Sequence, residues 1–422
     1  MWCHSMKITL KWGFIAGAVL STLVGCSDED PEPVPEKTQL RVPLYPYIPD
    51  AAGDQLQAMA ARIESEFEQA HPEVDLIVNP SCFNDDFYDP EALARSLKGE
   101  GECAYDVVET DTVILRELVA LNAVRPWPRL PQNIDWHPAG LAASRQQQST
   151  YGVPHWLCGD FIISRDESVR QARTESALRH ALAGLDTPKP DMAVNLLGSW
   201  NLPALYLDAW ADRNGSANVA SAVTTSNYDS VALQSLRSFV QTCQSAGANP
   251  CIDGTYDQDE NFDLPATLFA TGQVDATMGY SERLHVIIRN LPAGQSASDL
   301  KISSAPLAEG SHPILFTDSY FLGTRCTGAC EQAALAFVDY MSQPSTFEWI
   351  LMSEDAPAGT RVPRYLLPAT LDSYATPKLQ ADPFYPVLNV ESREGGPFPN
   401  GGLLNIRHQM RDDILTAITS EG

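Results

Sequence analysis

The sequence predicts an α/β fold built from two lobes, each a mostly parallel sheet flanked by helices. Short apolar stretches of strand length alternate with stretches in which apolar residues recur every three or four positions, an order typical of α/β layers. Residues 38–422 are also more than a single core usually accommodates, so we expect two lobes.

The elements of the first half follow a strand–helix–strand order. Residues 40–45 are apolar enough for a strand, and the proline that follows ends it. Apolar residues spaced by three and four predict a helix over residues 56–67. Further strands are predicted over residues 74–78 and 106–111, after which helical spacing resumes over residues 113–121.

The second half continues in the same style. Helices are predicted over residues 231–242 and 331–341, and another helix should end at the glycine within residues 267–272. Residues 275–280 have the pattern of a strand that leads into a loop. The two halves are similar in pattern, but the sequence contains no repeat of fixed period.

The N-terminus has the pattern of a bacterial lipoprotein signal peptide over residues 1–25. Lys7 and Lys11 precede an apolar stretch that is too short to span a bilayer as a helix. It ends in a Leu-Val-Gly-Cys box, in which the thiol of Cys26 would carry the lipid. Residues 26–37 are acidic and rich in proline, which predicts an extended tether. We therefore expect an exported lipoprotein, anchored to a bacterial membrane in the periplasm or at the cell surface.

The chain is strongly acidic, with a formal net charge of −26 at pH 7. Nucleic acid is disfavoured as a partner, because phosphate binding needs a positive surface. The acidity can raise the encounter rate of a cationic ligand, or it can serve only to keep the protein in solution. Both interpretations stay open on charge alone.

Nine cysteines are present, and one of them has no obvious partner. Cys3 lies in the signal peptide and Cys26 in the lipidation box. Proximity in an oxidising compartment favours three disulfides, although six cysteines allow fifteen pairings. The favoured pairs are Cys82/Cys103, Cys243/Cys251 and Cys326/Cys330. Cys158 is left over, and it is either a buried small apolar residue or a reactive thiol.

Glu282 and two histidines are candidate bases. Glu282 follows the strand that ends at Tyr280, and ligands collect beyond the carboxyl ends of strands, although an exposed loop glutamate is the ordinary alternative. His155 precedes Cys158 by three residues, so on an extended strand the two side chains point to opposite faces. His285 reaches the site only if a helical turn follows Glu282.

Metal and nucleotide motifs are not found in the sequence. Residues 257–268 begin like a calcium loop, but Phe262 stands where the loop needs glycine and Leu268 where it needs glutamate. Phosphate-cradling G-x-x-x-x-G-K, H-E-x-x-H and C-x-x-C patterns do not occur. We expect neither a metal nor a cofactor.

Five motifs occur in the order found in the thiaminase I (thiamine pyridinylase) family, which the chain resembles from about Leu40 to beyond Leu367. They are Arg41 to Asp50, Tyr105 to Asp111, Tyr151 to Cys158, Gly279 to Glu282 and Pro313 to Asp318. The resemblance implies the two-lobed fold of type II periplasmic solute-binding proteins, with the ligand in a cleft between the lobes. Motifs from both halves must then converge on that cleft.

The resemblance also implies residue roles. Cys158 matches the nucleophile of the family and Glu282 its general base. The implied substrate-binding residues are Tyr45, Tyr47, Asp111, Tyr280, Phe316 and Asp318, with Asp318 near the pyrimidine amino group. The family has tyrosine where this chain has Phe316, so a hydroxyl is lost and a stacking face is kept. The loop over residues 81–103 is longer here, and Tyr88 is its candidate pocket tyrosine.

The function implied is cleavage of thiamine, in which an amine or thiol displaces the thiazole through a covalent Cys158–pyrimidine adduct. The alternative is a non-catalytic solute-binding lipoprotein that delivers thiamine or a related pyrimidine to an ABC transporter. A carbohydrate-binding lipoprotein is a third hypothesis, and it leaves Cys158 unexplained. A binding protein has no use for a free thiol paired with Glu282, so the two residues together favour the enzyme. We expect a monomer with thiamine and a small amine or thiol as its partners.

The two lobes should be discontinuous in sequence. We expect residues 38–154 and 317–362 to form the first lobe, and residues 155–316 and 363–422 to form the second. The chain would cross between the lobes near Pro154, Phe316 and Val362.

Overall fold

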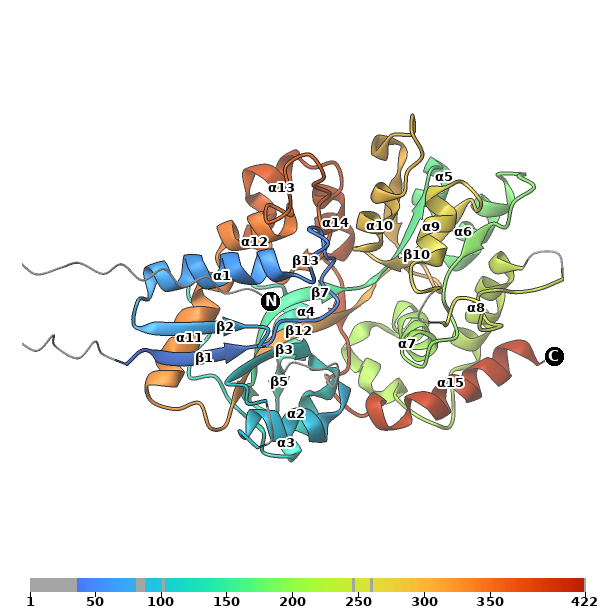
Figure 1. Ribbon diagram of the computed structural model, residues 1–422. Coiled ribbons are helices and arrows are strands. Elements are labelled where there is room, and N and C mark those ends of the chain that lie inside the picture. Colours follow the sequence, from blue (N-terminus) through green and yellow to red (C-terminus); the bar gives the residue numbers. More distant parts are fainter. Residues whose placement is uncertain (1–35, 81–87, 101–102, 245–246, 259–260, 421–422) are drawn as a thin grey trace, which may run out of the picture. The chain divides into compact units, whose positions relative to one another are not determined.

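The computed structural model describes residues 36–80, 88–100, 103–244, 247–258 and 261–420 (Figure 1). The chain divides into a unit over Met1–Glu36 and a unit over Lys37–Gly422, and the second unit contains the sheets and helices of the fold. The predicted signal peptide, the predicted lipidation site Cys26 and Cys82, which was predicted to pair with Cys103, lie outside the described residues. Within the described part of the chain, none of the helices has the length and apolar character needed to cross a bilayer.

The N-terminal strands form a two-stranded sheet, and the long strand β12 belongs to a six-stranded sheet (Figure 1). A two-stranded sheet is formed by β1 (Thr38–Val42) and β2 (Val74–Val78). A six-stranded sheet consists of β3 (Val107–Asp111), β4 (Val124–Arg125), β7 (Gly152–Cys158), β12 (Ile314–Gly323), β13 (Leu367–Pro368) and β14 (Gly396–Pro397). Every residue of β7 and of β12 is buried, so these two strands form the centre of this layer.

A separate four-stranded sheet belongs to the second lobe. Its order is β11 (Lys301–Ser304), β8 (Asp160–Ser164), β10 (Ala276–Tyr280) and β9 (Met192–Ala193). A small hairpin of β5 (Arg145–Gln146) and β6 (Ser149–Thr150) lies apart from both larger sheets. Strands β7 and β8 are consecutive in the chain and lie in different sheets, so the chain passes from one sheet to the other at Gly159. The lobe boundaries proposed from the sequence stay a prediction.

The expectation of mostly parallel sheets was wrong, although the α/β class is confirmed. Strand β12 runs antiparallel to β3, β4 and β7 and parallel only to β14. Strand β8 is antiparallel to both of its neighbours. The alternation of strands and helices identifies the layers, but β7, β8 and β12 join strands that are distant in sequence, and pairing direction between distant strands is not encoded in local periodicity.

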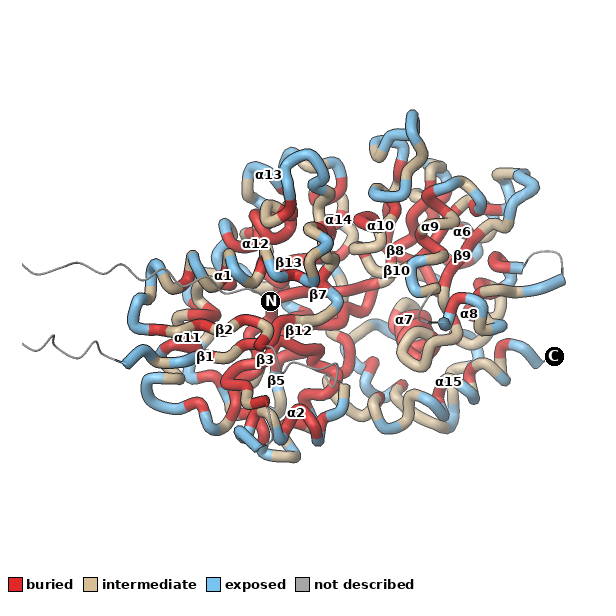
Figure 2. Tube along the Cα trace, viewed as in Figure 1, coloured by how far each residue is buried: buried red, intermediate tan, exposed pale blue. Residues whose placement is uncertain are grey.

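Fifteen helices within the described ranges cover the sheets. They are α1 (Gln57–Ala70), α2 (Pro90–Leu97), α3 (Leu115–Ala120), α4 (Pro138–Ala143), α5 (Glu167–Arg170), α6 (Glu175–Ala183), α7 (Asn201–Asn214), α8 (Ser230–Val240), α9 (Leu264–Ala270), α10 (Arg283–Arg289), α11 (Ala329–Met341), α12 (Pro344–Leu351), α13 (Pro377–Ala381), α14 (Tyr385–Ser392) and α15 (Leu403–Thr419). Helices α1 and α11 pack on the β1–β2 sheet, whereas α15 packs on α7 and α8. Their inner faces are buried and their outer faces exposed, as Figure 2 shows.

The elements expected from periodicity are present, with small shifts at their ends. The strand expected over residues 74–78 is β2, and the strand over residues 275–280 is β10. The helices expected over residues 56–67 and 331–341 are α1 and α11. Helix α9 ends where the glycine signal placed its end, because Gly272 adopts a φ of 76°, which an L-residue with a side chain rarely adopts.

Gly159 is a glycine for a steric reason. A Cβ built on it would lie 2.7 Å from Leu315 Cδ2, a distance that requires the neighbour to shift. Leu315 belongs to β12 and directly precedes Phe316, which pairs with Cys158 at the end of β7. The Leu315 side chain therefore packs against the point at which β7 ends and β8 begins.

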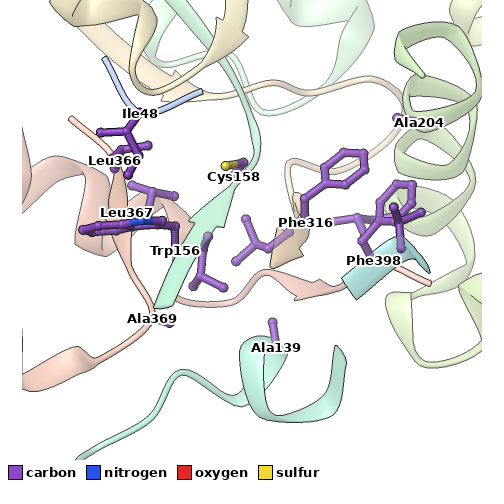
Figure 3. Packing of buried hydrophobic residues seen from close by; sticks show 14 of the residues in the cluster. Ile48, Ala139, Trp156, Cys158, Ala204, Phe316, Leu366, Leu367, Ala369 and Phe398 are labelled. Carbon is purple, nitrogen blue, oxygen red and sulfur yellow. The ribbon is translucent and has the colours of Figure 1, made fainter. Parts of the chain in front are cut away.

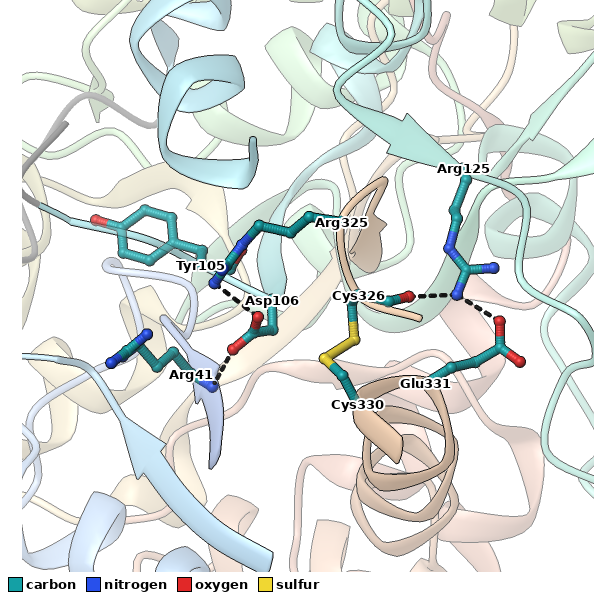
Figure 4. Close-up of a disulfide and its surroundings, with 8 residues drawn as sticks. All are labelled: Arg41, Tyr105, Asp106, Arg125, Arg325, Cys326, Cys330 and Glu331. Carbon is teal, nitrogen blue, oxygen red and sulfur yellow. Dashed lines mark hydrogen bonds and ion pairs between the residues drawn. A yellow bond between two sulfur atoms is a disulfide. The ribbon is translucent and has the colours of Figure 1, made fainter. Parts of the chain in front are cut away.

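Disulfides and ion pairs connect segments that lie outside the central strands. Two of the predicted pairs are present, Cys243–Cys251 and Cys326–Cys330, and Cys103 is also disulfide-bonded. Beside Cys326–Cys330, Asp106 accepts from Arg325 at 2.7 Å and from the backbone N–H of Arg41 at 2.9 Å (Figure 4). Asp106 and the two sulfurs lie close together, but both sulfurs are committed to the disulfide and the carboxylate to Arg325, so the group is a structural clamp.

The ion pair between Arg364 and Asp355 is fully buried. Arg364 donates to both carboxylate oxygens of Asp355 at 2.7 Å and to the carbonyl oxygen of Pro49 at 2.9 Å. The guanidinium also donates to the carbonyl oxygen of Ile350 in helix α12 at 2.6 Å. It therefore connects this helix to the segment that contains Pro49.

We predict that Asp355→Ala lowers the free energy of unfolding by roughly 3–5 kcal/mol, because it leaves the Arg364 guanidinium buried and unpaired. Asp339→Ala, which breaks the exposed Arg129–Asp339 pair, is the matched control and should cost no more than about 1 kcal/mol. Urea unfolding of the two variants measures both. Equal losses would contradict the role given to the buried pair.

Candidate functional site

A cavity of about 740 Å³ lies between residues of the two lobes. This volume is within the range of small-molecule sites. Its walls bring together seven of the residues singled out in the sequence, namely Tyr45, Tyr47, Asp111, Cys158, Tyr280, Glu282 and Phe316. These residues come from five separate stretches of the chain, so the fold collects the family-like motifs at one place.

Cys158 is the last residue of β7 and is the free cysteine among the described residues (Figure 3). It is buried, with 3% of its surface exposed, and lies opposite Phe316 in the register of β7 with β12. Its thiol donates to Asp318 Oδ2, with a Sγ–Oδ2 distance of 3.9 Å. The carboxylate in contact with the thiol is therefore Asp318, which does not itself line the cavity surface.

Buried carboxylates without a positive partner surround the thiol. Burial raises the pKa of Asp111 to about 7, although its Oδ1 accepts from the Val113 N–H at 2.8 Å. Burial and the charge of Asp111, which is its register partner, raise the pKa of Asp318 well above the ordinary range. Burial also raises the pKa of Glu282, which the charge of Arg283 partly offsets. The arrangement favours a cation, whose charge would stabilise the ionised carboxylates.

The thiol is held in its neutral form. Burial raises the pKa of Cys158 well above its ordinary value, followed by the charges of Glu282, Asp318 and Asp111. Glu282 Oε2 and Asp318 Oδ1 are buried and lack hydrogen-bond partners among the described residues. Acceptor atoms in this condition are available to a proton or to a ligand. The site therefore holds a neutral thiol together with two carboxylates, each of which has one oxygen free to accept a proton.

Aromatic rings form a second wall of the cavity. Tyr45 and Tyr47 meet edge to face at 5.4 Å, Tyr47 lies 6.5 Å from Tyr88, and Tyr88 lies 5.3 Å from Trp200. The guanidinium of Arg407 covers the Trp200 ring at 4.4 Å. Tyr88 was the candidate from the longer loop, and it lines the cavity. Trp200 was missed, because a tryptophan before a helix has no sequence signal that separates a pocket wall from a core.

Phe316 lines the cavity and stacks on a second aromatic ring, that of Phe398. Its ring lies 3.7 Å from that of Phe398 at an interplanar angle of 18°, and 5.9 Å from that of Tyr280 (Figure 3). Phe316 therefore presents an apolar face to the cavity from a supported position. Because this residue is phenylalanine, the hydroxyl group that a tyrosine would place at this position is missing.

The segment that carries Tyr45 is fixed by Glu109. This buried carboxylate accepts the Tyr45 N–H at 2.9 Å and is hydrogen-bonded to Nδ1 of His155, which also lies 3.1 Å from the Tyr320 hydroxyl. His155 does not line the cavity, which agrees with its opposite face on β7. It is therefore a structural residue behind the site.

His285 does line the cavity. A helical turn follows Glu282, since the His285 N–H donates to the Glu282 carbonyl at 3.0 Å and α10 begins at Arg283. Its Nδ1 lies 3.1 Å from the carbonyl oxygen of Pro363, and burial lowers its pKa. The sequence predicted that His285 reaches the site only if a helical turn follows Glu282. The turn is present, and His285 lines the cavity as a neutral ring.

The fold is that of two-lobed type II periplasmic binding proteins, and solved structures of thiaminase I share it. Thiaminase I from Bacillus thiaminolyticus superposes with a TM-score of 0.69 at 21% identity, over 89% of this chain and 99% of that chain. Clostridium botulinum thiaminase I in complex with thiamin gives 0.70 at 18% identity, over 90% and 100%.

Sugar-binding proteins superpose almost as well. The sugar-binding protein MalE from Xanthomonas citri gives a TM-score of 0.67 at 16% identity, over 90% of this chain and 92% of that chain. The sequence matches no protein-family model and no curated protein. At these identities the similarities establish the fold.

We predict that Asp111 makes the ligand-free protein less stable as pH rises from about 4 to about 7. Its folded-state pKa is raised to about 7 from the ordinary 3.8, so the folded state binds more protons than the unfolded state within this window. The stabilisation that protonated Asp111 contributes is fully present below this pH window and is lost above it. Urea unfolding across pH should show a shallower decline for Asp111→Asn than for wild type.

Asn keeps the oxygen that accepts from Val113, so the change removes charge and little else. Asp299→Asn, at an exposed position outside the cavity, should follow the wild-type profile. An Asp111→Asn profile that parallels wild type throughout would contradict the prediction.

Proposed function

We propose that this protein is a thiamine pyridinylase, which cleaves thiamine by displacing its thiazole with an amine or thiol. The observation that carries the proposal is a free, buried Cys158 in the same cavity as the unpartnered carboxylate of Glu282. A nucleophile beside a base is the arrangement that covalent catalysis requires. The likeness to a thiaminase I solved in complex with thiamin supports the choice of substrate.

The proposed chemistry begins with proton transfer from Cys158 to Glu282. The thiolate adds to the pyrimidine ring, and the electron-rich adduct expels the thiazole, which leaves with the electron pair of the broken carbon–nitrogen bond. The acceptor then bonds to the methylene carbon, and the pyrimidine–sulfur bond breaks with its electron pair returning to sulfur. Glu282 returns its proton to the thiolate. A positioned base of this kind contributes roughly 10²–10⁴ to the rate.

The substrate would assist this proton transfer. The thiazolium ring is a cation, and Asp111 and Glu282 line the cavity with Asp318 directly behind Cys158, whereas the arginines of the cavity wall are Arg283 and Arg289. A bound cation favours ionised neighbours. It would therefore lower the pKa of the Cys158 thiol toward the range in which a thiolate forms, and only while substrate is present.

The alternative function is non-catalytic binding of thiamine or a related pyrimidine for delivery to a transporter. The likeness to MalE and the aromatic walls of the cavity favour it. A binding protein gains nothing from a free thiol held against carboxylates, whereas a pyridinylase needs one. Cys158 therefore favours the enzyme.

We further propose that the protein is exported, anchored through a lipid on Cys26, and monomeric. The support is the N-terminal signal pattern and the periplasmic-binding-protein fold. Its partners would be thiamine and a small amine or thiol acceptor. Two lobes, formed by residues 38–154 with 317–362 and by residues 155–316 with 363–422, would close around the substrate.

The deciding experiment incubates the purified body, residues 38–422, with thiamine and pyridine and measures free thiazole by chromatography. Thiazole release supports the enzyme. A protein that binds thiamine tightly yet releases no thiazole, with pyridine, aniline or a thiol supplied, is a binding protein.

We predict that Cys158→Ser abolishes thiazole release and leaves thiamine affinity nearly unchanged, because the rings and carboxylates of the cavity remain. Glu282→Gln should lower turnover roughly 10²–10⁴-fold, since an amide cannot accept the thiol proton. The double variant should be scarcely worse than either single variant, as expected for groups that act in one step. Glu309→Gln, at an exposed position outside the cavity, is the matched control. Additive losses would show that the two residues serve separate steps.

We predict that Asp318→Asn weakens thiamine binding by about 1.5–3 kcal/mol, the usual value of a hydrogen bond to a charged group. The change removes a charged acceptor for the pyrimidine amino group. Calorimetric titration in a Cys158→Ser background measures binding without turnover. An unchanged dissociation constant would place the amino group elsewhere.

A further inference from the structure

A second, smaller cavity adjoins the first. Its volume is about 80 Å³, several times the roughly 10–15 Å³ that one water needs. Asn201, Phe262, Tyr280 and Arg283 line both cavities. A molecule bound in the large cavity beside these residues can therefore extend one end into the small one.

Asp160 is the carboxylate of the small cavity. It is the first residue of β8, two residues after Cys158, and lies opposite Tyr280 in the register of β8 with β10. Its backbone carbonyl accepts from the Ala305 N–H at 2.9 Å. Its side chain is half-buried and forms no ion pair or hydrogen bond with the described residues, so its oxygens are accessible to a ligand.

Two other polar side chains of this cavity already have partners. Arg283 donates to Asp263 Oδ1 at 2.6 Å, and its guanidinium lies over the Phe262 ring at 4.0 Å. The Asn201 amide donates to the carbonyl oxygen of Asn195 at 3.0 Å. The Asp160 carboxylate is therefore the acidic acceptor that a ligand entering this cavity would meet.

Much of the remaining wall is apolar. Tyr280 and Phe262 contribute rings, and Ala204 of α7 is one of its small apolar residues. Figure 3 shows Ala204 on that helix. A donor on an aromatic ring suits this shape, because the ring packs on the walls while the donor meets the carboxylate. An anion does not suit it, since it would lie against Asp160.

Asp160 can change its protonation state near neutral pH. Burial, and next the charge of Glu282, raise its pKa to about 7, and the charge of Arg283 opposes this shift. A group with this pKa can accept a proton and release it again during turnover. The charge of Asp160 also acts on Cys158, so the carboxylate and the thiol lie within electrostatic reach of each other.

We propose that the small cavity receives the amino group of the acceptor, a primary aromatic amine, and that Asp160 removes the proton this amine must lose. The inference rests on the proposed function and deepens it. The nitrogen lone pair forms the bond to the methylene carbon, and the pyrimidine–sulfur bond breaks with its electrons returning to Cys158. One of the two protons on the new ammonium goes to Asp160, which leaves a neutral secondary amine.

The test compares two acceptors that differ in this proton. Aniline must lose one after attack, whereas pyridine carries none on its nitrogen. In Asp160→Asn, the ratio of turnover with aniline to turnover with pyridine should fall by roughly 10²-fold. Asp191→Asn is the matched control, since Asp191 precedes β9 in the same lobe, lines neither cavity and should keep the wild-type ratio.

Ala204→Leu tests the cavity with Asp160 intact. Filling the small cavity from α7 should raise the Michaelis constant for aniline, relative to that for pyridine, roughly tenfold. An unchanged relative constant would show that the amine lies elsewhere and would overturn the inference.

Equal losses with both acceptors in Asp160→Asn, or no loss with either, would also overturn the inference and leave the proposed function standing. Wild-type protein that releases thiazole with neither acceptor would instead remove the proposed function, and the inference with it.

Discussion

The site depends on the pairing of β12 along both of its edges. The strand is buried over its whole length, so its pairing with β3 on one side and β7 on the other cannot slip without moving every side chain to the opposite face. The same register sets Asp318 beside Asp111 and Phe316 opposite Cys158. A single buried strand thus fixes the position of the free thiol, the carboxylate in contact with it and one aromatic face of the cavity.

The electrostatics of the cavity follow from this placement. Carboxylates that would repel one another in water are held together by backbone pairing, and burial raises the pKa of Asp111, Asp318 and Glu282. The protein without ligand therefore stores an unfavourable charge arrangement that a cationic ligand relieves. Under the proposed function, selectivity and activation would have one origin, because the carboxylates that attract a cationic ligand also raise the pKa of the Cys158 thiol.

Much of the fold and the centre of the site could be predicted from the sequence. Strand β2 and helix α11 follow from apolar periodicity, and Cys158 stands out because the other cysteines of the body sort into pairs by proximity. Strand direction could not be predicted, since local periodicity is the same for parallel and antiparallel partners. Trp200 and Asp160 were missed because each lines a cavity only through the packing of distant segments, which a single sequence does not record.

The glycine between Cys158 and Asp160 has a consequence for how the protein protects its thiol. Gly159 joins two sheets, and the contact with Leu315 leaves no space for a side chain at that joint. A rotation of one sheet against the other would move Asp160, which begins β8, and Glu282, which follows β10, relative to Cys158 at the end of β7. The charges of both carboxylates raise the pKa of the Cys158 thiol, so an arrangement that moved them away and exposed the thiol would lower that pKa. The short link at Gly159 thus keeps the thiol beside the groups that hold it neutral, and a neutral thiol is poorly reactive toward oxidants and electrophiles.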